Sequence, residues 1–137
     1  MTELKIVLDT NVFLVILGKQ SSYRWIFEKI ISGEFTLCIS TPIMLEYVEV
    51  IARKTNSQVA ESIKDFLNTH PHVKHIDTYY QFQLITEDED DNKFVDCAIA
   101  SNALCLVSND KHFKILKQIP FPKVNLLSLS EFQELFS

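Results

Sequence analysis

The chain alternates short apolar runs with longer segments in which apolar residues recur at helical spacing. Five runs have the length and the branched residues of buried strands, at 5–8, 35–39, 73–76, 104–107 and 124–127. Amphipathic helices are expected between them, at 23–31, after Ser40, at 56–67, after Asn92, at 111–117 and after Ser130, which should cap the last helix. The segment 79–86 fits neither pattern. Strands that alternate with helices predict an α/β fold of three layers, α/β/α, around a central, mostly parallel sheet of four or five strands.

Length and composition place the chain among ordinary globular domains. It has 137 residues, of which 47% are hydrophobic and 23% are charged, so we expect one domain spanning 1–137. The longest apolar stretches, such as 11–17, are far shorter than the roughly 20 residues that cross a bilayer. No membrane span is predicted, and residues 1–5 do not resemble a secretory signal, so a cytoplasmic protein is expected.

The three cysteines lie in apolar surroundings and have no short paired spacing. Cys38, Cys97 and Cys105 are odd in number, and their spacing fits neither a zinc site nor a disulfide framework. We expect them to be buried free thiols.

The negative charge is concentrated in one stretch. The formal net charge of −5 argues against a protein that coats nucleic acid through many phosphate contacts. Six of the eighteen acids lie between Glu87 and Asp96. Carboxylates gathered in this way can be offset by bound cations, which is the first indication of function.

Acids from four separate segments are expected at one edge of the sheet. Asp9 and Asp110 directly follow predicted strands, Glu46 lies in the opening turns of the helix after the second strand, and Asp88, Asp90 and Asp91 lead the helix before the fourth. Ligands of open α/β sheets bind outside the carboxyl ends of the strands. Packed carboxylates repel one another unless a cation neutralises them, and oxygen ligands suit Mg²⁺ or Mn²⁺.

Such a site fits phosphoryl chemistry. No Cys or Ser nucleophile stands beside a base, whereas bound metals polarise a phosphate and activate a water. Each acid taken alone is equally well explained as a helix cap or a turn residue. The interpretation therefore depends on all of them converging.

Four motifs along the chain resemble those of PIN-domain nucleases. They read Leu8-Asp9-Thr10-Asn11-Val12-Phe13, Leu45-Glu46, Asp88-Glu89-Asp90-Asp91-Asn92-Lys93-Phe94-Val95-Asp96-Cys97-Ala98 and Leu106-Val107-Ser108-Asn109-Asp110. The acidic stretch that runs into Lys-Phe resembles the VapC-like toxins of bacterial toxin–antitoxin pairs. The resemblance implies a ribonuclease that uses Mg²⁺ or Mn²⁺, an antitoxin protein as partner, and homodimers.

The resemblance also assigns roles by position. It implies Asp9, Glu46, Asp91 and Asp110 as metal-binding or catalytic acids, Asp96 as a fifth metal contributor, Asp88 as support, and Asn11 and Ser108 as residues that orient the acids or a bound water. The chain departs from the family pattern at Ser108-Asn109-Asp110, where Thr-Gly-Asp is more usual, and at Glu89, where proline is frequent. A shift of one residue at a helix start rotates a side chain by about 100°, so we rank the acids of the stretch as Asp91, then Asp96, then Asp88.

Other polar and aromatic residues have two possible roles each, one in binding and one in the structure. Lys111, Lys114 and Lys117 could hold RNA phosphates or form a solvated helix face. The aromatic residues of the unassigned segment, Tyr79, Tyr80 and Phe82, could stack on bases or cover the sheet edge. The three histidines at 70, 72 and 75 are more simply a helix-ending loop than a metal site. The apolar segments at 12–17 and 23–27 are richer than one small core requires, which also favours a homodimer.

The acids also allow three alternative interpretations. A receiver domain needs paired acids after the first strand and a strand-terminal Lys-Pro, whereas the chain has Pro122-Lys123 before the last strand. A phosphatase of the haloacid dehalogenase type needs two Asp residues two apart after the first strand, and Asn11 takes the second place. The stronger alternative is a PIN-like domain without catalysis that serves as an RNA-binding or scaffolding module.

Overall fold

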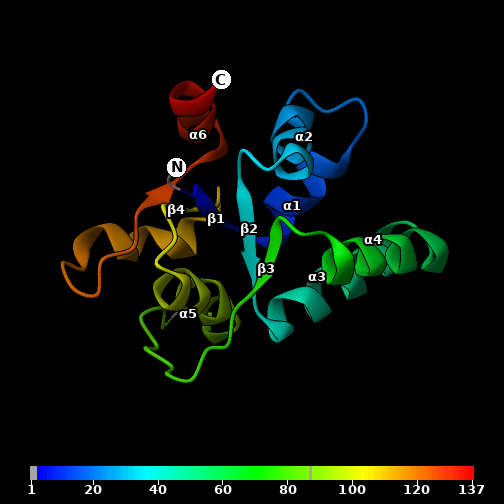
Figure 1. The fold of residues 1–137 in the computed structure, drawn as a ribbon. Helices are drawn as coiled ribbons and strands as arrows, with labels where there is room; N and C mark the ends of the chain where they lie inside the picture. Colours follow the sequence, from blue (N-terminus) through cyan, green and yellow to red (C-terminus); the bar gives the residue numbers. More distant parts are fainter. Residues whose placement is uncertain (1–2, 87) are drawn as a thin grey trace.

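The computed structural model describes residues 3–86 and 88–137 and contains one five-stranded parallel sheet (Figure 1). In chain order the strands are β1 (Lys5–Leu8), β2 (Thr36–Ile39), β3 (Val73–His75), β4 (Cys105–Val107) and β5 (Leu126–Leu127). Their order across the sheet is β3-β2-β1-β4-β5, and every neighbouring pair is parallel. All five predicted strands are present, although the last is only two residues long. Glu87, counted above in the acidic stretch, lies outside the described residues, as do Met1 and Thr2.

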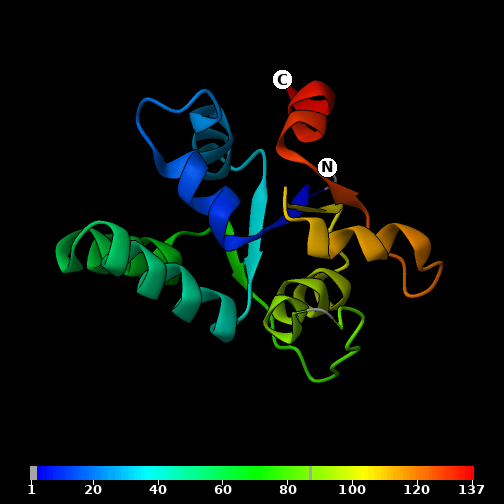
Figure 2. The same cartoon turned by 180° about the vertical axis from the view of Figure 1, so that it is seen from behind.

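Helices cover both faces of the sheet, so the predicted three-layer α/β/α fold is confirmed (Figures 1 and 2). One layer holds α1 (Thr10–Leu17), α2 (Arg24–Ser32), α3 (Thr41–Lys54) and α4 (Ser57–Thr69). The opposite layer holds α5 (Asn92–Ser101), which the short 3₁₀ helix η1 (Glu89–Asp91) precedes, and a second 3₁₀ helix, η2 (Lys111–Gln118). The chain ends in α6 (Leu129–Phe136).

The strands are buried on both faces, which explains why they form continuous apolar runs in the sequence. Ile6, Val7 and Leu8 are fully buried, and β2 and β4 are buried along their whole length. Cys38, Cys97 and Cys105 are buried free thiols, as predicted.

The last helix begins two residues before the predicted start. Its N-cap is Ser128 and not Ser130. Ser128 and Glu131 form a capping box, in which each side chain accepts a hydrogen bond from the other residue's backbone N–H. This reciprocal pair satisfies two backbone donors at once, which gives Ser128 the advantage as cap.

The segment 76–86, which includes the unassigned residues 79–86 and the last residue of the predicted third strand, contains neither helix nor strand. Two side chains of α5 hold it in place. Asn92 accepts a hydrogen bond from Ile85 N at 2.9 Å and donates one to Ile85 O at 2.8 Å, while Asp96 accepts one from Phe82 N at 3.1 Å. The irregular backbone is therefore ordered by polar side chains of the neighbouring helix.

Within residues 3–86 and 88–137, no helix combines the length and the apolar character needed to cross a membrane.

The order of the strands reverses between β1 and β4. The chain leaves β1 through α1 and α2 to β2 on one side, whereas it leaves β4 through η2 to β5 on the other side. Loops that diverge in this way leave a crevice at the carboxyl ends of the two strands, where α/β proteins bind ligands. Asp9 and Asp110 stand at these two ends.

Candidate metal centre

Asp9 follows β1 and is held by two hydrogen bonds. It is the N-cap of α1, where its Oδ1 accepts from Val12 N at 2.8 Å, and its Oδ2 accepts from the hydroxyl of Ser108. Only 6% of Asp9 is exposed. Burial raises the pKa of this carboxyl, and the hydrogen bonds from Ser108 and Val12 oppose the rise.

Asp110 follows β4 and is fixed by its neighbours. Its backbone N–H donates to Ser108 Oγ at 3.0 Å, and its Oδ1 accepts from the backbone N–H of His112 at 2.9 Å. Ser108, predicted to orient the acids, therefore contacts both Asp9 and Asp110.

Asp91 lies at the end of η1, in the helical layer that contains α5 and η2. Burial, then repulsion by Asp88 and Asp110, raises its pKa to about 6, and the nearby His112 opposes the rise. Its Oδ2 is buried and accepts no hydrogen bond from the residues that the structure describes. A buried carboxylate oxygen is stabilised by a proton or by a nearby positive charge.

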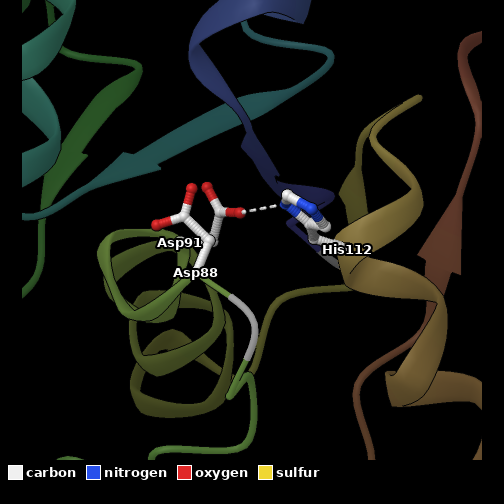
Figure 3. A group of neighbouring side chains, drawn as sticks. All are labelled: Asp88, Asp91 and His112. Atoms are coloured by element: carbon white, nitrogen blue, oxygen red, sulfur yellow. Dashed lines mark ion pairs between the residues drawn. The ribbon is translucent and has the colours of Figure 1, made fainter.

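His112 is a residue of this site that the sequence analysis missed. Its Nδ1 lies 3.6 Å from Asp91 Oδ2 and 3.5 Å from Asp110 Oδ1. Asp88, Asp91 and His112 offer three ligand atoms that lie within 4.8 Å of one another, with the two acids on one side and the imidazole of η2 on the other (Figure 3). The only signal in the sequence was that His112 stands two residues after Asp110.

Glu46, on α3, has a protein partner for each of its carboxylate oxygens. The hydroxyl of Thr10 donates to Oε2, and Lys93 Nζ lies 2.7 Å from Oε1. The same Nζ lies 2.8 Å from Asp90 Oδ2. Lys93 was missed as a site residue, although it was noted as part of the acidic motif.

The four acids predicted to act together line one cavity of about 170 Å³. Asp9, Glu46, Asp91 and Asp110 come from four separate segments and share it with Thr10, Asn11, Val50, Arg53, Lys54 and Phe94. Arg53 and Lys54, at the end of α3, add two cations that the sequence analysis did not place here. The structure thus brings Asp9, Glu46, Asp91 and Asp110 together, and their roles in metal binding and catalysis stay predictions.

The remaining predicted residues lie around this cavity. Asp96 lines a separate cavity with Asp90 and Lys93, and its Oδ1 accepts from Phe82 N. Asp88 accepts a hydrogen bond from Asp90 N at 3.1 Å and caps η1. Asn11 lines the acid cavity, and Lys111 and Lys114 are exposed on η2.

The residues present fit a hard divalent cation. The set is dominated by carboxylate oxygens, the ligands that Mg²⁺ and Mn²⁺ prefer, with one imidazole beside them. Burial raises the pKa values of Asp9 and Asp91, and the repulsion of each by Asp110 raises them further, so a bound cation would favour the charged form of both carboxyls.

Fold and cavity together define an α/β protein with a carboxylate cluster at the point where the strand order of a parallel sheet reverses. A family model described as "PIN domain" matches residues 5–112, and the chain belongs to this family of nucleases. Comparison with the curated proteins finds no match.

Solved structures of PIN proteins share the fold. One is VapBC2 from Rickettsia felis bound to a promoter DNA fragment, with 21% identity, a TM-score of 0.63 and coverage of 90% of this chain and 98% of the other. DNA-bound VapBC from Salmonella typhimurium has 17% identity, a TM-score of 0.56 and coverage of 91% and 98%. The PIN domain endonuclease Utp24 has 17% identity, a TM-score of 0.55 and coverage of 91% and 84%.

Proposed function

We propose that the protein is a ribonuclease that depends on Mg²⁺ or Mn²⁺ and acts as the toxin of a toxin–antitoxin pair. The observation that carries this proposal is the cavity in which Asp9, Glu46, Asp91 and Asp110 meet from four segments. Membership of the PIN-domain family supports the nuclease activity.

In this proposal Asp9, Asp91 and Asp110 hold the cation, and Glu46 is the fourth carboxylate that lines the same cavity. When bound, the cation polarises the phosphate and makes a water more acidic. Ser108 keeps Asp9 and Asp110 in place through its two hydrogen bonds. Asp96 serves to hold the segment 76–86, because its Oδ1 accepts from Phe82 N.

Three lysines give η2 a surface suited to phosphates. A 3₁₀ helix has three residues per turn, so Lys111, Lys114 and Lys117 form one row while Phe113 and Leu116 face the core. The row begins one residue after Asp110. It is therefore proposed to bind the RNA backbone on either side of the cut, together with Arg53 and Lys54.

The proposed partners are an antitoxin and a second copy of the chain. Two of the similar structures are VapBC complexes, and the chain covers 98% of the matched chain in each. The apolar side chains of 12–17 and 23–27 pack mostly within the single chain, since Val12, Phe13, Ile26 and Phe27 are buried in its core. The homodimer therefore rests on the family resemblance, and light scattering at micromolar concentration tests it. A cytoplasmic location agrees with three cysteines that remain free thiols.

The test of the activity is hydrolysis of RNA by the purified chain. With Mg²⁺ or Mn²⁺ the protein should cut RNA, and EDTA should stop it. Asp9→Asn keeps the shape of the side chain but removes one charge, and should lower the rate by roughly two orders of magnitude, as when a charge interaction of the transition state is lost. Glu61→Gln, on the exposed face of α4, is the matched control. Equal cleavage by wild type and Asp9→Asn at saturating metal would contradict the proposed role of Asp9, and RNA binding without cleavage by the wild type would favour the non-catalytic RNA-binding module.

A further inference from the structure

A second cavity, of about 220 Å³, adjoins the acid cavity. The two cavities share Asp9, Asn11 and Asp110. The remaining lining residues of the second cavity are Val12 and Val15 of α1, Leu129 of α6, and Asn109 of the loop after β4. Any group seated in it lies directly beside the acids of the candidate metal centre.

The lining combines an apolar slot with two amides. Val12, Val15 and Leu129 supply apolar surface, and Val15 remains 41% exposed. Asn109 Oδ1 accepts a hydrogen bond from Leu129 N at 3.0 Å, which fixes the orientation of this amide. Within residues 3–86 and 88–137, neither Asn109 Nδ2 nor the side chain of Asn11 has a hydrogen-bond partner.

We propose that this second cavity binds the base of the nucleotide next to the phosphate that is cut. The proposal rests on the proposed ribonuclease function. A neutral ring fits beside Asp9 and Asp110, whereas a second phosphate would be repelled by them. The volume is below the roughly 300 Å³ at which pockets for drug-sized ligands begin, so it suits a single base.

The amides favour a base over an apolar side chain of a partner protein. The edge of a base offers donors and acceptors to Asn side chains, and its face packs on apolar surface. Asn11 and Asn109 are both exposed, and an apolar side chain would make no hydrogen bond to either amide, whereas the edge of a base can bind both.

The first test compares cleavage of RNA oligonucleotides that carry each of the four bases on either side of the cut. Asn109→Ala removes the Nδ2 donor together with the Oδ1 acceptor of Leu129 N, and should reduce the preference at one adjacent position by about three- to tenfold, the effect of one net hydrogen bond. Val15→Trp fills the slot and should lower kcat/KM at least about tenfold while Mn²⁺ affinity stays unchanged in calorimetry. The control is Val59→Trp on α4, since Val59 is also 41% exposed.

The second test does not depend on cleavage. In NMR titrations with the four nucleoside 5′-monophosphates and Ca²⁺, the signals of the Val15 methyl groups and of the Asn109 side-chain amide should shift in the wild-type protein, and in Val15→Trp the Asn109 shift should be lost. If wild type cuts RNA but both variants keep its base preference and rate, the base site is wrong and the nuclease stands. If wild type cuts nothing, the nuclease is wrong, and unshifted Val15 and Asn109 signals overturn the base site separately. Loss of antitoxin binding by Val15→Trp with unchanged cleavage would assign the slot to a peptide and overturn the proposal.

Discussion

The hydroxyl of Ser108, after β4, donates a hydrogen bond to Oδ2 of Asp9, after β1. The same oxygen of Ser108 accepts the backbone N–H of Asp110 at 3.0 Å. One small side chain therefore fixes two acids that are a hundred residues apart in the chain. Because Ser108 is buried, these bonds are not exposed to competition from bulk water.

Ser108→Ala should weaken metal binding and slow cleavage. It leaves Asp9 Oδ2 and Asp110 N without this partner, and the loss of a group that orients metal ligands typically costs about 10- to 100-fold in affinity or activity. Calorimetry with Mn²⁺ and cleavage rates measure both effects. Ser108→Thr keeps the hydroxyl and should remain within a few-fold of wild type. If Ala and Thr behave alike at this position, the hydroxyl has no orienting role.

Without metal, ionisation of Asp91 should make the protein less stable as the pH rises. Its pKa is about 6 in the folded chain and about 3.9 in an unfolded one, so the folded state binds the proton more tightly. The stabilisation is fully present below the unfolded pKa and is lost as the pH rises through about 6, by up to about 3 kcal/mol in total. Thermal unfolding in EDTA measures it.

Two variants isolate the contribution of Asp91. Asp91→Asn should remove this part of the pH dependence, whereas Asp65→Asn, on the exposed face of α4, should retain it. Mn²⁺ should restore stability above pH 6 in wild type but much less in Asp91→Asn. Identical pH profiles for wild type and Asp91→Asn would contradict the assigned pKa.

The sheet and the places of Asp9 and Asp110 at its carboxyl edge could be predicted because local patterns determine them, whereas the choice of Asp91 within its stretch came from the family resemblance. Fully buried parallel strands require continuous apolar runs, and an acid directly after such a run must lie at the carboxyl edge of the sheet. His112 and Lys93 could not be predicted in the same way. Their positions depend on how η2 and α5 pack across the crevice, and the sequence pattern does not define that packing. Asp96 faces the segment 76–86 because of its rotation about the helix axis, which is sensitive to a shift of one residue.

Lys93→Met should destabilise the metal-free protein and make it more dependent on metal. Lys93 is 13% exposed in its side chain and lies within 3 Å of oxygens of both Glu46 and Asp90. Removal of this cation leaves the acids uncompensated, and losing hydrogen bonds to charged groups costs about 1.5–3 kcal/mol each when they are well shielded. Unfolding with and without Mn²⁺ should show a larger metal-induced rise in Tm than in wild type. The control Lys64→Met, on the exposed face of α4, should change neither value.

Asp96→Asn should separate an anchoring role from metal binding. The asparagine retains an oxygen that can accept from Phe82 N but loses the charge that a cation would need. If Asp96 holds the segment 76–86, Mn²⁺ affinity should fall less than about threefold, whereas Asp91→Asn should lower it by about 10-fold or more. Asp96→Ala removes the acceptor as well, so the backbone N–H of Phe82 loses its partner. An added protease should then cut the native protein faster within 76–86. A loss of Mn²⁺ affinity in Asp96→Asn as large as that in Asp91→Asn would instead make Asp96 a direct metal ligand, as the resemblance implied.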